Sequence, residues 1–214
     1  MNPFPAPDTP QQDLYIWRLG FPIVRAIALF LCPMRVIGLE NVPERGPYII
    51  VGNHISWLEP EWIAWAVKRP IRYMAKEEIF EWFLVGGLLR VIACFPVKRG
   101  ASDRRAFITA LRVLEAEQVL GFFPEGHRSE SGTMIRAHPG IAGIALRSGA
   151  PLVPVATTGA KGAFGKFWRR DLTLTFGKAF YAKDLGETEP QAVADAIMRR
   201  VAGLLPDEMR GIYT

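Results

Sequence analysis

Residues 48–67 read YIIVGNHISWLEPEWIAWAV and predict a strand, a loop and a helix in succession. Tyr48 to Gly52 form a short apolar run of the kind that becomes a buried strand. A helix is expected from Pro60 to Val67, because proline at the first helical position loses no hydrogen bond. The loop between them, residues 53–59, has the position that active-site loops of α/β proteins commonly occupy.

The same alternation of strand-like and helix-like runs continues along the rest of the chain. Val119–Phe123 and Leu152–Thr157 are strongly apolar, as strands are in a sheet that is covered on both faces. Further strands are expected at 34–39, 71–75 and 172–176, with a short one before Lys98; further helices are expected at 77–89 (broken or ended near Gly86 and Gly87), 102–118 (capped by Ser102), 140–147 and 190–205. The chain is therefore predicted to form a single α/β domain with a mixed, mostly parallel central sheet covered by helices.

Two N-terminal segments precede this domain, which we place at residues 34–214. Residues 1–12 contain four prolines and are expected to form a loose arm. Residues 13–33 are expected to form amphipathic helices, split near Pro22, whose apolar side contacts a membrane while the arginines meet lipid headgroups. The alternative is a helix that packs on the core with its arginines in water.

The composition excludes several classes of protein. No stretch without a charged residue exceeds 13 residues, as in Ser148–Ala160, whereas a membrane-spanning helix needs about 20. The first residues lack the basic and apolar regions of a cleaved secretory signal, so a cytoplasmic location is expected. The net charge of +5 favours anionic partners, but the basic residues are scattered and show no nucleic-acid-binding signature. Cys32 and Cys94 lie in apolar runs and are expected to be buried thiols, with no disulfide or metal site.

His54 is the first candidate for chemistry. Free imidazole has a pKa of roughly 6.5, which suits a general base near neutral pH. Glu59 follows five residues later, a spacing that would point the two side chains apart on a continuous helix. His54 is therefore expected before the helix and Glu59 at its start, where the carboxylate can fold back and accept a hydrogen bond from the imidazole. On its own, a histidine near a glutamate is more often structural or solvated.

Two basic turns strengthen the case for a site. Residues 121–129 read GFFPEGHRS and end a strand in a tight turn whose backbone amides and Arg128 can hold an anion. Residues 96–100 read PVKRG and place Lys98 and Arg99 just before a predicted helix N-terminus. Each turn alone could simply carry solvent-facing charges. Together with the histidine, they predict a phosphate site.

Four segments, taken in order, carry a resemblance to a known family. They are NHISWLEP (53–60), FPVKRG (95–100), FPEGHRS (123–129) and PLVPVATTGA (151–160). They resemble the four motifs of the glycerolipid acyltransferase family, which includes bacterial 1-acyl-sn-glycerol-3-phosphate acyltransferases. The likeness extends over about residues 34–180.

The resemblance implies roles for individual residues. His54 would be the catalytic base and Glu59 would assist it, although the family usually has aspartate at this second position. Arg99, Glu125, Gly126 and Arg128 would shape the site for the acceptor's phosphate, and Pro154 would lie near the acyl chain or the active-site wall. Asn53, Ser56, Lys98 and Ser129 complete the expected substrate-binding set. No catalytic role is expected for His127, which stands where threonine is common, or for His138.

The expected reaction is the acylation of 1-acylglycerol 3-phosphate to phosphatidic acid by acyl-CoA or acyl carrier protein, with no cofactor, no metal and no covalent acyl-enzyme. The protein would lie on the cytoplasmic side of the cell membrane, peripheral or monotopic, with residues 82–95 and 161–170 as further candidate contact segments. The alternatives are a buried helix leading into a strand for residues 82–95 and a solvated loop for residues 161–170. Two alternatives stay open. The acceptor could instead be glycerol 3-phosphate, another lysophospholipid or a lyso-aminolipid, or the chain could be a non-catalytic membrane lipid-binding module.

Overall fold

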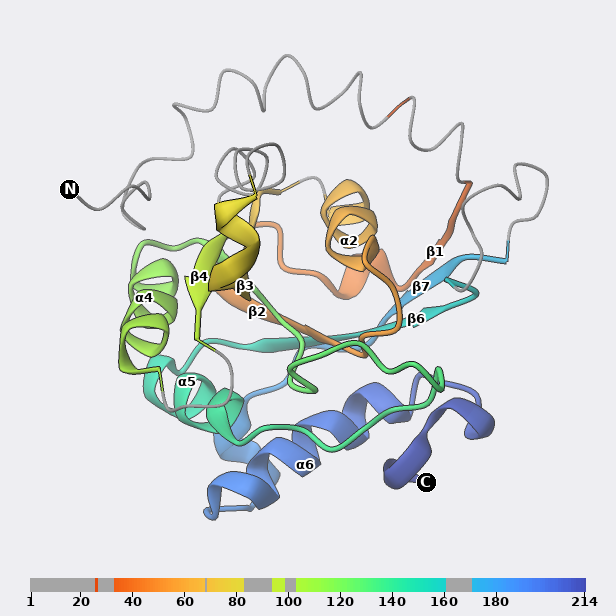
Figure 1. Cartoon of the computed structure of the whole chain (residues 1–214). Coiled ribbons are helices and arrows are strands. Elements are labelled where there is room, and N and C mark those ends of the chain that lie inside the picture. Colours follow the sequence, from red (N-terminus) through yellow and green to blue (C-terminus); the bar gives the residue numbers. More distant parts are fainter. Residues whose placement is uncertain (1–25, 27–32, 68, 83–93, 99–102, 161–170) are drawn as a thin grey trace.

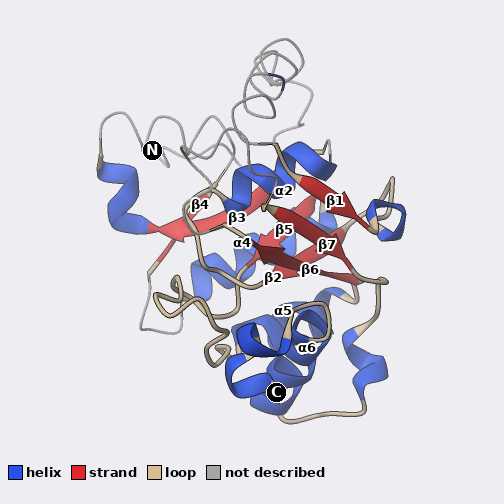
Figure 2. Cartoon of the chain, turned by 90° about the vertical axis from the view of Figure 1, so that its right-hand side faces the viewer, coloured by secondary structure: helices blue, strands red, loops and turns tan. Residues whose placement is uncertain are grey.

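A seven-stranded sheet with helices on both faces forms the centre of the molecule (Figures 1 and 2). The computed structural model describes residues 26, 33–67, 69–82, 94–98, 103–160 and 171–214. The strands are β1 (Arg35–Ile37), β2 (Tyr48–Gly52), β3 (Ile71–Lys76), β4 (Phe95–Val97), β5 (Val119–Phe122), β6 (Leu152–Thr158) and β7 (Thr173–Phe176).

The strand order is β1-β7-β6-β2-β5-β3-β4. From β6 to β4 all neighbouring strands are parallel, whereas β7 pairs antiparallel with β6. Because β1 is parallel to β7, these two strands run opposite to the other five. The predicted α/β class and the mixed, mostly parallel sheet are confirmed.

Helices cover both faces of this sheet (Figure 2). Helix α2 (Glu59–Val67) lies on one face, and α5 (Gly140–Ser148) and α6 (Pro190–Ala202) lie on the other, with α4 (Arg104–Glu115) packed beside α5. Short 3₁₀ helices fill connections: η2 (Leu39–Asn41), η3 (Glu77–Glu81), η4 (Ala182–Leu185), η5 (Asp207–Met209) and η6 (Gly211–Tyr213). In the described ranges, no helix combines the length and the apolar character needed to cross a bilayer.

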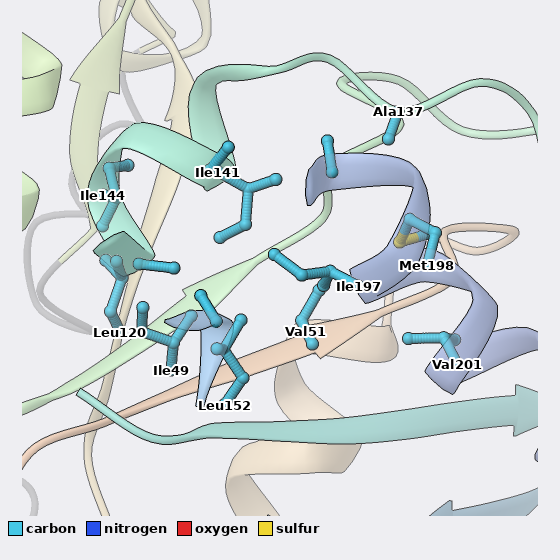
Figure 3. Packing of buried hydrophobic residues seen from close by; sticks show 14 of the residues in the cluster. Ile49, Val51, Leu120, Ala137, Ile141, Ile144, Leu152, Ile197, Met198 and Val201 are labelled. Atoms are coloured by element: carbon cyan, nitrogen blue, oxygen red, sulfur yellow. The ribbon is translucent and has the colours of Figure 1, made fainter. Parts of the chain in front are cut away.

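The sheet separates two hydrophobic clusters. Successive residues of β2 point to opposite faces, so Ile49 and Val51 join one cluster while Tyr48 and Ile50 join the other. On the first side, strand residues meet the apolar stripes of α5 and α6 (Figure 3). All of β2 is buried, which is what a central strand covered on both faces requires. Strand β2 therefore provides a fixed base for the loop that follows it.

Several predicted boundaries shift for local physical reasons. Helix α4 is capped by Asp103, one residue later than predicted, because Oδ1 of Asp103 accepts the backbone N–H groups of Arg105 and Ala106. Strand β1 stops at Ile37 because Gly38 has φ +74°. The helix expected at 77–89 is a 3₁₀ helix over Glu77–Glu81 in its described part, and the helix expected at 190–205 already ends at Ala202.

Some predictions fall outside the described residues. These are the arm at 1–12, most of the amphipathic segment at 13–33, residues 83–93, Arg99 and the basic aromatic run at 161–170. Cys32 is also among them. Cys94 is buried as expected, and burial raises the pKa of its thiol to about 12. A thiol of this kind is a small core side chain at neutral pH.

Candidate active site

Three neighbouring strands deliver the candidate residues to one edge of the sheet. Strand β2 lies between β5 and β6 and is parallel to both, so the C-terminal ends of all three strands meet. Asn53, which directly follows β2, bridges to β6: its side-chain amide donates to the carbonyl of Thr157 at 3.0 Å, and its oxygen accepts from the Thr157 N–H at 2.8 Å. Asn53 thus anchors the loop that begins with His54.

The backbone of His54 is held by the loop that follows β5. Its N–H donates to Oε1 of Glu125 at 2.9 Å, and its carbonyl accepts from the N–H of Ser129 at 2.7 Å. The backbone N–H and carbonyl of His54 therefore join the motif at 53–60 to the motif at 123–129, and His54 and Glu125 are 71 residues apart in sequence. The position of the imidazole depends on this loop as much as on β2.

The ring of His54 is fixed from two directions. Nδ1 lies 2.6 Å from Oε2 of Glu59, and the ring stacks on Phe123 with centroids 4.3 Å apart and an interplanar angle of 18°. The side chain remains 14% exposed. The predicted contact between His54 and Glu59 is confirmed. It occupies Nδ1 and leaves Nε2 as the ring atom that can take a proton from a hydroxyl.

Glu59 is the first residue of α2 and is completely buried. Besides the imidazole, its carboxylate accepts the N–H of Ile55 at 2.9 Å and that of Ser56 at 3.1 Å through Oε1. The loop thus folds back over the helix start, where a negative charge is favoured by the helix dipole. The extra methylene of glutamate does not separate the carboxylate from the ring.

Glu125, which accepts the backbone N–H of His54, is also completely buried. In addition to the N–H of His54, it accepts the N–H of Ile135 through Oε2 at 3.0 Å. Burial raises the pKa of Glu125 to about 7; the two amide hydrogen bonds oppose this shift, and the nearby Glu59 carboxylate adds to it. Both oxygens are bonded to backbone amides, so Glu125 shapes the site by holding the loop that carries His54.

Replacing Glu125 by glutamine is expected to lower kcat about tenfold to a hundredfold, with a smaller change in the acceptor KM. Glutamine has one acceptor and one donor for two N–H groups, so one amide loses its partner and the His54 loop shifts. Steady-state kinetics would measure both constants. A rise in the acceptor KM with unchanged kcat would contradict the positioning role and favour direct contact with the substrate.

The Glu125→Gln variant should also differ from the wild type in how its stability depends on pH. Because the pKa is raised from 4.5 to about 7, the folded protein binds this proton more tightly than the unfolded chain does. The free energy of unfolding should therefore decrease as the pH rises from about 4.5 to about 7, since the folded state binds more protons than the unfolded state in this range. Denaturant unfolding at several pH values should show a smaller slope for Glu125→Gln than for the wild type.

The remaining residues of the motif at 123–129 form the turn above the site. Gly126 has φ +73°, and a Cβ there would lie 2.7 Å from the His138 ring, so both the conformation and the space require glycine. The Cζ atom of Arg128 lies over the Trp57 ring, 4.0 Å from its centroid. The Ser129 hydroxyl pairs with that of Ser131 at 2.9 Å. The turn that carries Arg128 therefore packs on the His54 loop, through the Arg128–Trp57 contact and the Ser129 N–H bond to the His54 carbonyl.

Three other predicted residues are engaged elsewhere or lie further away. The hydroxyl of Ser56 accepts the N–H of Leu58 at 3.3 Å. Lys98 follows the edge strand β4, which β3 and β5 separate from β2, and its ammonium lies 3.6 Å from Glu77. Pro154 is a buried residue of β6 paired in register with Val51 of β2. Arg99 is outside the described residues.

The sequence did not single out two residues that the geometry makes important, Phe123 and Trp57. Phe123 begins the motif at 123–129. The signal that could have pointed to it is its position directly after the central strand β5. Trp57 lies between His54 and Glu59, and an aromatic side chain in a polar loop was its signal. Neither signal indicates which partner the ring contacts, because these contacts join loops from different strands.

The α/β fold and the buried histidine–carboxylate pair together form an arrangement that can support general-base chemistry. A family model described as Acyltransferase matches residues 33–158, and the chain belongs to that family. The predicted membership is thereby confirmed.

Individual relatives agree with this assignment. The chain is 26% identical over 176 residues to 1-acyl-sn-glycerol-3-phosphate acyltransferase of Bacillus subtilis, covering 80% of this chain and 87% of that protein. It is 31% identical over 145 residues to the enzyme of the same description from Borreliella burgdorferi, covering 64% and 58%. The crystal structure of the 1-acyl-sn-glycerophosphate acyltransferase PlsC from Thermotoga maritima has the same fold, with a TM-score of 0.64, 23% identity and coverage of 88% and 78%.

Proposed function

We propose that this acyltransferase moves a fatty acyl group from acyl-CoA or acyl carrier protein to the free hydroxyl of 1-acylglycerol 3-phosphate, giving phosphatidic acid. The observation that carries the proposal is the histidine ring held at Nδ1 by Glu59, at 2.6 Å, beside a turn that presents Arg128. The relatives named above, which are described as 1-acyl-sn-glycerol-3-phosphate acyltransferases, support the choice of acceptor.

The chemistry follows from which ring nitrogen is engaged. Nε2 of His54 takes the proton of the acceptor hydroxyl, and the oxygen attacks the carbonyl carbon of the thioester. The carbon–sulfur bond breaks, the sulfur leaves with a proton returned by the imidazolium, and an ester bond has formed. The carboxylate of Glu59 stabilises the imidazolium between these two steps. No cofactor takes part, since the thioester supplies the activated acyl group.

The acceptor's phosphate would meet the turn at residues 125–129. Within the described part of the chain, no ion pair involves Arg128, so its charge is available to an anion. Guanidinium binds phosphate through parallel N–H donors. Lys98 and Arg99 remain candidates for the outer part of this phosphate site. We place the protein at the cytoplasmic side of the cell membrane, because its proposed acceptor and product are lipids.

The test is an acceptor panel with purified protein and either acyl-CoA or acyl-carrier-protein thioester. The panel contains 1-oleoylglycerol 3-phosphate, glycerol 3-phosphate, a lysophospholipid with a larger headgroup, a lyso-aminolipid and phosphate-free 1-oleoylglycerol. Thiol release should be stimulated most by 1-oleoylglycerol 3-phosphate, and mass spectrometry should identify phosphatidic acid. Preferential acylation of another acceptor, or no stimulation by any of them, would overturn the proposal.

The matched control is a mock preparation from cells that carry the vector alone. Thiol release without any acceptor measures thioester hydrolysis and is subtracted. Comparison of 1-oleoylglycerol 3-phosphate with 1-oleoylglycerol isolates the contribution of the phosphate, because the two acceptors share the acyl chain and the reacting hydroxyl.

A further inference from the structure

Trp57 is the most exposed large hydrophobic residue of the described chain, with 63% of its surface accessible. It lies in the loop between His54 and Glu59, and the face of its ring carries the Arg128 guanidinium, with Cζ 4.0 Å from the ring centroid. This separation is well inside the range of about 6 Å in which a cation and an aromatic face attract each other. The contact therefore joins the histidine loop to the turn at 125–129 at the solvent-facing side of the site.

Hydrogen bonds hold the backbone next to both Trp57 and Arg128. On the Trp57 side, the N–H of Ser56 donates to Glu59 at 3.1 Å, and the N–H of Leu58 donates to the Ser56 hydroxyl at 3.3 Å. On the Arg128 side, the next residue, Ser129, donates its N–H to the His54 carbonyl at 2.7 Å. The backbone next to Arg128 is consequently tied to the backbone of His54.

The contact with the indole leaves Arg128 able to bind an anion. A cation–π contact attracts the positive charge to the aromatic face, and the guanidinium has five N–H donors that can reach an external anion. A salt bridge with a carboxylate of the protein would compete with an external anion, but the indole does not. The contact also restricts the rotamers of a long side chain before the anion arrives, which lowers the entropic cost of binding.

We propose that Trp57 is a positioning residue that holds the Arg128 guanidinium ready for the phosphate of the acceptor. The inference rests on the proposed function and adds to it a residue that determines affinity for phosphate-bearing acceptors. Trp57 acts through Arg128, so its effect should disappear when Arg128 is absent.

The decisive experiment is a double-mutant cycle with Trp57→Leu, Arg128→Ala and the double variant. For 1-oleoylglycerol 3-phosphate, Trp57→Leu should raise KM roughly fivefold and leave kcat within about twofold of the wild type. Adding Trp57→Leu to Arg128→Ala should change KM no further. Trp57→Phe, which keeps an aromatic face, should recover most of the loss. For phosphate-free 1-oleoylglycerol, none of these changes should alter KM.

Trp82 provides the matched control, because it is also exposed, at 61%, and follows η3 outside the loops of the site. Trp82→Leu should leave the acceptor KM unchanged. Equal losses in Trp57→Leu and Trp82→Leu, additive effects of Trp57→Leu and Arg128→Ala, or an equal loss with 1-oleoylglycerol would overturn the inference and favour a general contact with lipid.

Direct binding separates this inference from the proposed function. Calorimetric titration with glycerol 3-phosphate measures Kd without turnover, and the same non-additive pattern is expected in the four proteins. If the wild type acylates no phosphate-bearing acceptor, the proposed function fails while the binding cycle still decides the role of Trp57. If the wild type is active but Trp57→Leu leaves both KM and Kd unchanged, only the inference fails.

Discussion

Replacing His54 by alanine is expected to lower kcat for acyl transfer about a thousandfold, within the range that a general base contributes. The variant loses Nε2, the proposed acceptor of the hydroxyl proton, in a ring whose other nitrogen lies 2.6 Å from Glu59. The acceptor's phosphate should still bind, since Arg128 belongs to a different loop. Initial rates of thiol release with 1-oleoylglycerol 3-phosphate would give kcat, and titration with glycerol 3-phosphate would show an unchanged Kd.

The matched control for this prediction is His127→Ala. His127 lies in the motif at 123–129 and is exposed, and no catalytic role is expected for it. It should retain close to wild-type kcat. Thermal unfolding would establish that His54→Ala folds, because its backbone bonds to Glu125 and Ser129 do not require the ring. Turnover above one-tenth of wild type in the His54 variant would mean that another group takes the proton.

The sequence predicted the elements that form the site because their signals are local. The apolar run at Tyr48–Gly52 and the proline near the start of α2 fixed a strand–loop–helix unit within 20 residues. The five-residue spacing between His54 and Glu59 then allowed only one way for the side chains to meet. The helix begins at Glu59, one residue earlier than the predicted Pro60, and Glu59 stands at the helix start as expected.

Contacts between distant loops could not be predicted in the same way. Glu125 was expected to take part in shaping a phosphate site, yet both of its oxygens accept backbone N–H groups, from His54 and Ile135. The residue types of a motif do not show which way a side chain points after a turn. That direction is set by the register of β2 against β5, which becomes visible only when the sheet is assembled.

The cap of α4 shows the same limit on a smaller scale. Ser102 and Asp103 are both good capping residues, and the pattern of apolar residues that follows does not distinguish a helix starting one residue later. The structure selects Asp103, whose carboxylate also accepts the N–H of Lys98 at 2.9 Å and thereby ties the end of β4 to the helix. The tertiary contact with Lys98 therefore favours Asp103 as the cap, whereas capping propensity alone does not distinguish it from Ser102.

Replacing Glu59 by glutamine is expected to lower kcat about a hundredfold or more, with little change in the acceptor KM. Glutamine is nearly isosteric, and its side-chain oxygen can still accept the N–H groups of Ile55 and Ser56, so the loop and the helix start should survive. The amide NH₂ would then face Nδ1 of His54 and donate to it. The neutral ring would carry its proton on Nε2, which is the atom that has to accept one, and the imidazolium would lose its counter-charge.

Two further variants identify the cause of that loss. Glu59→Asp keeps the charge, so it should retain more activity than Glu59→Gln even though its carboxylate is one methylene shorter. Glu61→Gln removes a carboxylate from the same first turn of α2 without touching the imidazole and should leave kcat within about threefold of the wild type. Equal losses in the two glutamine variants would assign the effect to the charge of the helix start, because only Glu59 controls the tautomer of His54.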